Sequence, residues 1–244
     1  MLAFRLLRVI LHLLAGLAIC ACIFPFIDET GRRRHIQRWS AQLLRHCRVR
    51  VEVEYCGPQT EGVPALLVAN HISWLDIFVI NSMTPHRFVA KSDIRNWPLI
   101  GWLCARTGTI FIARGRLRDV RRIFEDLVAS IRGNEHVAFF PEGTTAGQGA
   151  LLPFHANLFE AALDAKAAIL PCALRYLDAG GELHPAVDFV GDMSFAESLL
   201  AILRGSDITA YLKVLPLIDT AGAHRRELAD ASRAVIAAAL GIPD

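Results

Sequence analysis

The stretch that decides the fold is ALLVANHISWLD, at residues 65–76. Its first five residues, 65–69, are apolar and predict a buried strand. The polar residues Asn70 and His71 follow where that strand ends, and the apolar pattern resumes after Asp76. A strand that ends in titratable residues before a helix is a common way to build a site at the edge of a sheet.

His71 and Asp76 are the candidate catalytic pair. Within one straight α-helix, five residues subtend about 500°, so the two side chains would point apart by about 140°. They meet only if His71 lies in the turn and Asp76 in the first turns of the helix, with Ser73 as its cap. A carboxylate so placed orients an imidazole whose other nitrogen takes a proton. The alternative is a surface histidine and a helix-start aspartate.

Two further apolar segments end in residues suited to a site. The run VAFF at 137–140 leads into PEGT at 141–144, where Gly143 lets the backbone approach a ligand closely and tolerates positive φ. The segment GTIFIAR at 108–114 predicts a short strand that ends in Arg114. Each segment alone is equally compatible with an ordinary core strand and its turn.

The rest of the chain alternates between strand-like and helix-like segments. Strands are expected at residues 87–90, just before Lys91, and at 168–173, where Pro171 indicates an edge position or an irregularity. Further elements are expected as helices at 120–131, 157–165, 194–203 and 221–240 and as strands at 186–190 and 207–217. This alternation predicts an α/β domain around a mixed, largely parallel sheet flanked by helices.

In their order and spacing, the blocks around His71, Arg114, Glu142 and Pro171 resemble the four sequence blocks of the glycerophospholipid acyltransferase family, which includes the lysophosphatidate acyltransferases. The resemblance covers residues 51–214. It implies transfer of a fatty acyl chain from acyl-acyl carrier protein or acyl-CoA to 1-acyl-sn-glycerol-3-phosphate, which gives phosphatidic acid for phospholipid biosynthesis. The acyl donor is a substrate, and no cofactor or metal ion is implied.

The same resemblance implies a role for each candidate site residue. His71 would be the general base that removes a proton from the acceptor's hydroxyl, and Asp76 would hold its tautomer and stabilise its protonated form. The hydroxyl oxygen would then attack the thioester carbonyl without a covalent acyl-enzyme. The substrate-binding residues would be, at the phosphate, Lys91 and Arg114 and, lining the acceptor site, Glu142, Gly143 and Thr144.

One position departs from the family pattern. In many lysophosphatidate acyltransferases the third block continues into an arginine and a serine, whereas here Thr144 is followed by Thr145 and Ala146. Arginine suits bidentate binding of a phosphate, so one expected contact is missing. A second threonine also resembles the bacterial enzymes that acylate lyso-ornithine lipid, which is the alternative acceptor.

The N-terminal segment predicts attachment to a membrane. Residues 9–27 contain one histidine and no Asp, Glu, Lys or Arg, and about 17–25 apolar residues span a bilayer. A basic cluster suited to anionic cytoplasmic headgroups follows, comprising Arg32, Arg33, Arg34 and Arg38. We expect residues 1–47 to form an anchor with a second, amphipathic helix, and residues 48–244 to form a catalytic domain on the cytoplasmic side of the inner membrane. The anchor suits either a spanning or a one-leaflet helix; a cleaved signal peptide and a buried soluble helix are the alternatives.

Composition and charge exclude several other classes of function. The formal net charge of +2 gives no case for nucleic-acid binding. Five arginines between 114 and 122 suit either a solvated helix face or contact with anionic lipid or carrier protein. The six cysteines lack the spacing of zinc ligands. The partners that the family resemblance implies are membrane lipids, a lysophospholipid acceptor and acyl carrier protein.

Two other readings of the first block remain. A lipid hydrolase would use Ser73 as its nucleophile, but Ser73 lies outside any Gly-x-Ser-x-Gly elbow. A non-catalytic lipid-binding protein would have no chemical need for both His71 and Asp76.

Overall fold

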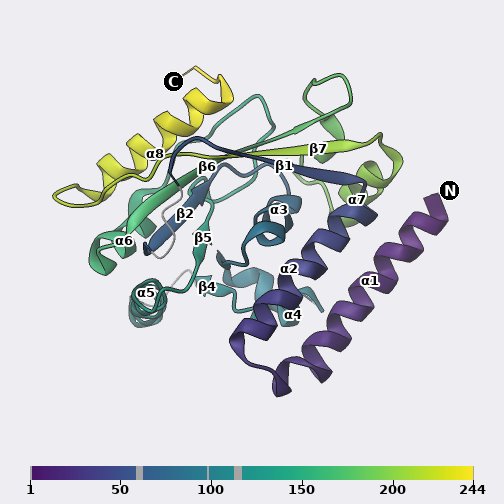
Figure 1. The fold of residues 1–244 in the computed structure, drawn as a ribbon, viewed down its shortest axis with the longest axis horizontal. Coiled ribbons are helices and arrows are strands. Elements are labelled where there is room, and N and C mark those ends of the chain that lie inside the picture. The colour runs from purple at the N-terminus through teal and green to yellow at the C-terminus, as the bar shows by residue number, and fades with distance from the viewer. Residues whose placement is uncertain (1, 59–62, 98, 113–116, 244) are drawn as a thin grey trace.

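The structure is a computed structural model that describes residues 2–58, 63–97, 99–112 and 117–243, with the side chains of 117–123 left out. At its centre is a sheet whose strand order is β1-β7-β6-β2-β5-β3-β4 (Figure 1). The strands are β1 (Val49–Tyr55), β2 (Ala65–Ala69), β3 (Arg87–Lys91), β4 (Ile110–Ile112), β5 (Val137–Phe139), β6 (Ala168–Leu177) and β7 (Ile208–Val214). All neighbours run parallel except β6 and β7, which run antiparallel. The prediction of a mixed, largely parallel sheet is confirmed.

Helices cover both faces of this sheet. They are α1 (Leu2–Cys22), α2 (Glu29–His46), α3 (Leu75–Met83), α4 (Ile100–Arg106), α5 (Leu117–Arg132), α6 (Glu160–Ala165), α7 (Phe195–Arg204) and α8 (Arg225–Leu240). Short 3₁₀ helices are η1 (Phe24–Phe26), η2 (Ser92–Asn96), η3 (Ala156–Phe159) and η4 (Pro185–Val187). One core cluster joins the sheet to α2, α3 and α7, and a second joins it to α5, α6 and α8. Because both faces are covered, central strands such as β2 read as unbroken apolar runs.

The structure corrects two predictions about strands. Residues 186–190 do not form a strand, because Pro185 starts the 3₁₀ helix η4 there. Pro171 does not lie in an edge strand, since β6 lies between β7 and β2. The expected irregularity is present: β7 ends at Val214, Leu215 N donates to Pro171 O at 2.9 Å, and the next pairing is the bridge between Ile169 and Ile218. The missing N–H of proline thus falls where β6 changes partners.

Two helix ends also differ from the expected bounds. The segment expected as one helix at 157–165 is the pair η3 and α6. The last helix starts at Arg225 rather than 221, because the His224 side chain caps it together with Glu227. The capping box of Ser194 and Glu197 at the start of α7 is confirmed.

The first two helices form a packed pair (Figure 1). The buried face of α1 carries Val9, His12, Gly16 and Cys20. His12 Nε2 donates to Trp39 O at 2.9 Å, and Trp39 Nε1 donates back to His12 O at 3.0 Å. Gly16 is required at this contact, since a Cβ there would lie 2.6 Å from Trp39 Nε1. The predicted second, amphipathic helix is confirmed, because Leu43 and Leu44 of α2 are buried.

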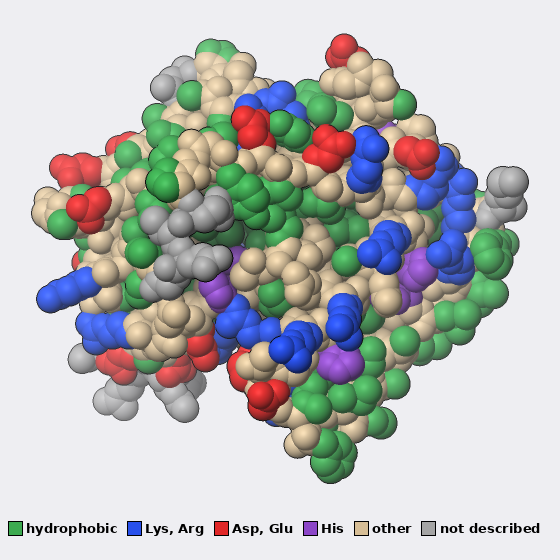
Figure 2. All heavy atoms as spheres, viewed as in Figure 1, with side chains coloured by type: hydrophobic (Ala, Val, Ile, Leu, Met, Phe, Trp, Pro, Cys, Tyr) green, Lys and Arg blue, Asp and Glu red, His purple; other side chains and the backbone are tan. Residues whose placement is uncertain are grey.

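The outer face of α1 is apolar and exposed at Phe4, Leu7, Leu11 and Leu14. Residues 2–26 are long and apolar enough to cross a membrane by length and composition. In Figure 2, apolar side chains lie along the right edge, where Figure 1 places α1, and basic side chains gather beside them.

Candidate active site

The candidate site lies at one edge of the sheet. Because β2, β5, β3 and β4 are parallel neighbours, their carboxyl ends meet at the same edge. His71 follows β2, Glu142 follows β5, and Lys91 ends β3, where it pairs in register with Ile112 at the end of β4. Lys91 is exposed. Arg114 lies outside the described residues.

His71 and Asp76 are in direct contact. His71 lies in the turn after β2, Asp76 is in the first turn of α3, and His71 Nδ1 is 2.7 Å from Asp76 Oδ2. The predicted arrangement of turn and helix is therefore confirmed. The prediction that Ser73 caps the helix is wrong, because Trp74 is the N-cap residue and no described side chain caps the start of α3. Asp76 Oδ2 accepts from the backbone N–H groups of Ile72, at 2.7 Å, and Ser73, at 2.9 Å.

Asp76 is fully buried, and Tyr176 reaches its other oxygen. The Tyr176 hydroxyl donates to Asp76 Oδ1 at 2.6 Å, so donors face both carboxylate oxygens. A buried carboxylate needs such donors, because its charge has lost contact with water. Burial, and then the charge of Asp76, raise the pKa of Tyr176 well above its ordinary value, so the phenol keeps its proton.

The imidazole of His71 is held with one nitrogen free. Since Nδ1 faces a carboxylate, it carries the proton that it donates to Asp76, and Nε2 is left as an acceptor. The ring stacks on Phe140 with centroids 3.9 Å apart and planes 7° apart. No hydrogen bond joins Nε2 to any residue in the described part of the chain, and the side chain is 18% exposed. This geometry suits a general base that takes a proton at Nε2.

Glu142 is buried and contacts backbone. Its Oε1 accepts from His71 N at 2.7 Å, and its Oε2 accepts from Leu152 N at 2.9 Å. Burial raises the pKa of Glu142, although the two N–H donors act in the opposite direction. Glu142 thus holds the main chain of His71 in place, a contact that the sequence did not predict.

The remaining residues of the third block surround this contact. Gly143 has φ +70°, and a Cβ there would lie 3.2 Å from the His155 ring. Thr144 is exposed. Thr145, the position that departs from the family pattern, makes a hydrogen bond within the fold: its hydroxyl donates to Phe189 O. Ser73 Oγ is buried and has no partner in the described structure, so it is not placed as a nucleophile.

Sequence reasoning missed three residues that support the site. The Asn70 side chain exchanges two hydrogen bonds with the backbone of Leu174, of 2.9 and 2.8 Å, and Gln148 Oε1 accepts from Tyr176 N at 2.6 Å. The one available signal was the length of the apolar run after Pro171, which continues to Leu177 and includes Tyr176.

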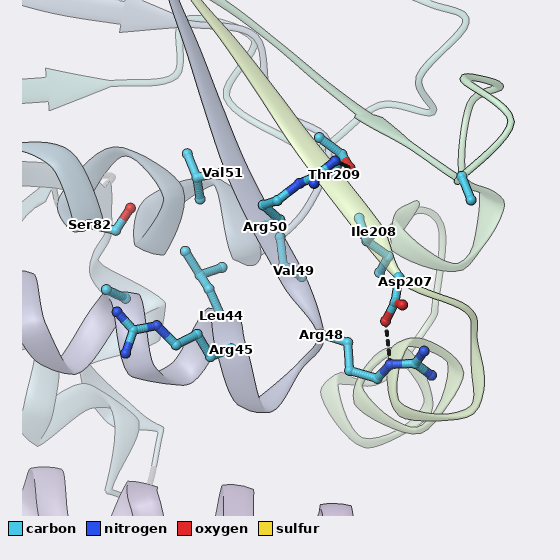
Figure 3. Close-up of a pocket in the computed structure, with 12 residues that line it drawn as sticks. Leu44, Arg45, Arg48, Val49, Arg50, Val51, Ser82, Asp207, Ile208 and Thr209 are labelled. Atoms are coloured by element: carbon cyan, nitrogen blue, oxygen red, sulfur yellow. Dashed lines mark hydrogen bonds and ion pairs between the residues drawn. The ribbon is translucent and has the colours of Figure 1, made fainter.

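A cavity of about 650 Å³ lies away from His71, between α2 and the starts of β1 and β7 (Figure 3). Arg45, Arg48 and Arg50 line it, but their guanidinium groups point in different directions. Arg48 is paired with Asp207 at 2.5 Å and Arg50 with Glu52 at 3.0 Å. Neither His71 nor Asp76 lines this cavity, so the geometry of the catalytic pair, rather than cavity size, defines the candidate site. In the described chain, no three His, Cys, Asp or Glu residues are grouped so as to hold a metal ion.

Comparison with known proteins shows matches to a family model and to named relatives. The family model described as Acyltransferase matches residues 48–175. The lyso-ornithine lipid O-acyltransferase of Pseudomonas aeruginosa is 34% identical over 231 residues, which cover 92% of this chain and 88% of that protein. The 1-acyl-sn-glycerol-3-phosphate acyltransferase of Neisseria gonorrhoeae is 35% identical over 177 residues, covering 70% and 69%.

Among solved structures, the 1-acyl-sn-glycerophosphate acyltransferase PlsC from Thermotoga maritima has a similar fold. The TM-score is 0.68 at 19% identity, over 99% of this chain and 97% of that one. The similarity therefore extends over the N-terminal helices as well as the sheet.

Proposed function

The chain belongs to the acyltransferase family, and from that premise we propose that it transfers a fatty acyl chain from a thioester to the hydroxyl of a lysolipid. The resemblance of its sequence blocks to this family is thereby confirmed. The observation that carries the proposal is the His71–Asp76 pair at the carboxyl edge of the sheet, 2.7 Å apart, with Nε2 of His71 free to accept a proton.

The proposed reaction needs one base and no covalent intermediate. Nε2 of His71 takes the hydroxyl proton as the acceptor oxygen attacks the thioester carbonyl carbon. The new C–O bond forms, the C–S bond then breaks, and the proton on His71 passes to the departing thiolate. Asp76 stabilises the imidazolium between these steps. Such a base contributes about 10²–10⁴ in rate.

The first acceptor that we propose is 1-acyl-sn-glycerol-3-phosphate. A phosphate monoester requires cationic partners. Lys91 ends β3 at the same sheet edge as His71 and pairs with Ile112, two residues before Arg114. The similarity to the Neisseria enzyme supports the same acceptor. In this proposal Lys91 and Arg114 bind the phosphate, while Glu142, Gly143 and Thr144 line the acceptor site.

A lyso-ornithine lipid is the second candidate acceptor. The observation that favours it is the Pseudomonas aeruginosa relative, which matches 92% of this chain. Thr145 agrees with it, because a threonine stands where many lysophosphatidate enzymes have a phosphate-binding arginine.

We propose that residues 1–47 attach the enzyme to the inner membrane, and that residues 48–244 form the catalytic domain on the cytoplasmic side. The exposed apolar face of α1 and the arginines that follow support attachment to an anionic lipid surface. The acyl donor in this proposal is acyl-acyl carrier protein or acyl-CoA.

The test of the acceptor is a side-by-side assay in detergent. Each donor is offered with lysophosphatidate or with lyso-ornithine lipid, and products are separated by mass. We expect product from lysophosphatidate, and a rate at least tenfold lower after Lys91→Ala. Product from lyso-ornithine lipid alone would make that lipid the acceptor and remove the proposed role of Lys91. Absence of product from either acceptor would contradict lysolipid acylation.

A further inference from the structure

The carboxylate behind His71 has a second side-chain partner in Tyr176. Oδ2 of Asp76 accepts hydrogen bonds from the imidazole of His71 and from two backbone N–H groups. Oδ1 accepts a hydrogen bond from the Tyr176 hydroxyl at 2.6 Å. Both side chains are fully buried. The tyrosine therefore contacts the catalytic pair without reaching the place where a substrate would meet Nε2.

The chain holds Tyr176 in this position by extending β6 beyond its neighbour. Pairing between β2 and β6 ends at Ala69 and Cys172, yet β6 continues to Leu177. Past that point the Asn70 side chain takes the place of a strand, since it both accepts from and donates to the backbone of Leu174. Beyond it, the backbone N–H of Tyr176 donates to Gln148 Oε1. Two side-chain amides thus fix the strand that carries the phenol.

We propose that Tyr176 is a positioning residue for acyl transfer: its hydroxyl fixes the rotation of the Asp76 carboxylate and draws off part of its negative charge. This inference rests on the proposed role of His71 as the base. Without the hydroxyl, Oδ1 would be a buried acceptor with no described partner, and the carboxylate could turn away from Nδ1. A carboxylate that has lost a donor also stabilises an imidazolium more strongly, because more of its charge stays on the oxygens.

The stronger stabilisation of the imidazolium shifts the pH dependence of the reaction in one direction, whereas a residue that only packs against Asp76 would cause no such shift. The titratable groups around His71 are Asp76 from α3 and Glu142 after β5, which it contacts directly, and Tyr176 from β6, which contacts Asp76. Of these, Tyr176 is the donor whose removal leaves both carboxylates in place. Replacing it by phenylalanine should make His71 hold its proton more tightly. The acidic limb of the kcat/KM profile should then move to higher pH.

The test compares Tyr176→Phe with Tyr211→Phe. Tyr211 is a matched control on β7, where its hydroxyl also donates to a carboxylate, that of Glu54. We expect Tyr176→Phe to leave KM within about threefold of the wild-type value and to raise the acidic limb of the kcat/KM profile by about half a pH unit or more. Tyr211→Phe should change neither quantity.

A second variant covers the case in which Tyr176→Phe does not fold. The chain has three tyrosines, Tyr55, Tyr176 and Tyr211. In the double variant Tyr55→Phe and Tyr211→Phe, difluorotyrosine incorporation therefore labels Tyr176 alone. The fluorinated phenol is a stronger donor in nearly the same volume, so the acidic limb should move to lower pH.

The outcomes separate this inference from the proposed function. The inference would be overturned if the acidic limb of the kcat/KM profile stayed at the wild-type pH in both Tyr176→Phe and the difluorotyrosine protein. Tyr176 would then act through packing only, even if kcat falls. Titration of the His71 ring by NMR reports the same shift without substrate. If the wild-type enzyme acylates neither acceptor while the ring titration still shifts, the proposed function fails and the Tyr176–Asp76–His71 coupling stands.

Discussion

Replacing Asp76 by asparagine removes one negative charge at almost constant volume. Three N–H donors point at Oδ2, from His71, Ile72 and Ser73, whereas one hydroxyl points at Oδ1. The amide oxygen must therefore take the Oδ2 position. The amide nitrogen then faces Tyr176, whose hydroxyl can rotate to accept. We expect the hydrogen bonds, and the tautomer of His71, to survive this substitution while the charge is lost.

The expected loss of activity in Asp76→Asn follows from the lost negative charge alone. A full positive charge on His71, about 4 Å from the carboxylate, is stabilised by about 4 kcal/mol at an effective dielectric constant of about 20. In a transition state with the proton partly transferred, about 2–4 kcal/mol of this is lost, so kcat should fall by about 30- to 1000-fold. KM should change little, because Asp76 is buried away from the substrate.

The assay is the initial rate of acyl transfer from a labelled thioester at saturating acceptor, with unfolding in urea measured in parallel. Asp178→Asn is the matched control, because Asp178 also accepts backbone N–H groups but lies in the exposed turn after β6. A kcat for Asp76→Asn within about threefold of wild type would refute the electrostatic role. A loss beyond about 10⁴ would refute the predicted amide orientation, since it would indicate the wrong tautomer.

Three further predictions concern stability. Glu142→Gln should lower the free energy of unfolding by about 1–3 kcal/mol in urea, because both carboxylate oxygens accept a backbone N–H and an amide has one acceptor oxygen; an unchanged midpoint would contradict this. Gly16→Val should cost about 1–3 kcal/mol by overpacking against Trp39, measured as a lower melting temperature than that of the exposed control Ala15→Val; equal melting temperatures would contradict that packing. Burial lowers the pKa of His86 from 6.5 to about 4, so the unfolded chain binds its proton first and stability should fall as the pH drops from 6.5 towards 4. His86→Gln should flatten that decline in a urea titration, and an unchanged slope would refute the assignment.

The sequence predicted those parts of the site that depend on local order. A strand, a polar turn and a helix within residues 65–83 suffice to bring His71 against Asp76. Likewise, the alternation of elements was enough for the sheet class, because parallel strands covered by helices require it.

Contacts between distant segments could not be predicted in this way. Tyr176 meets Asp76 across 100 positions, and Asn70 meets Leu174 across 104, so no local pattern marks either contact. The predicted Ser73 cap was wrong for a local reason: the carboxylate of Asp76 accepts from the N–H groups of Ile72 and Ser73 and fixes the turn, while Ser73 Oγ is buried without a described partner. A charged acceptor forms the stronger hydrogen bonds.

The most direct test of the central claim is acyl transfer by His71→Ala beside His136→Ala, in the same detergent and with both acceptors. His136 is an exposed histidine just before β5, at the opposite edge of the sheet from His71. We predict that His71→Ala loses activity by about 10²–10⁴, keeps its membrane attachment and melts within a few degrees of wild type, while His136→Ala stays fully active. Retention of more than about a tenth of wild-type kcat by a folded His71→Ala enzyme would show that another group is the base and would contradict the mechanism.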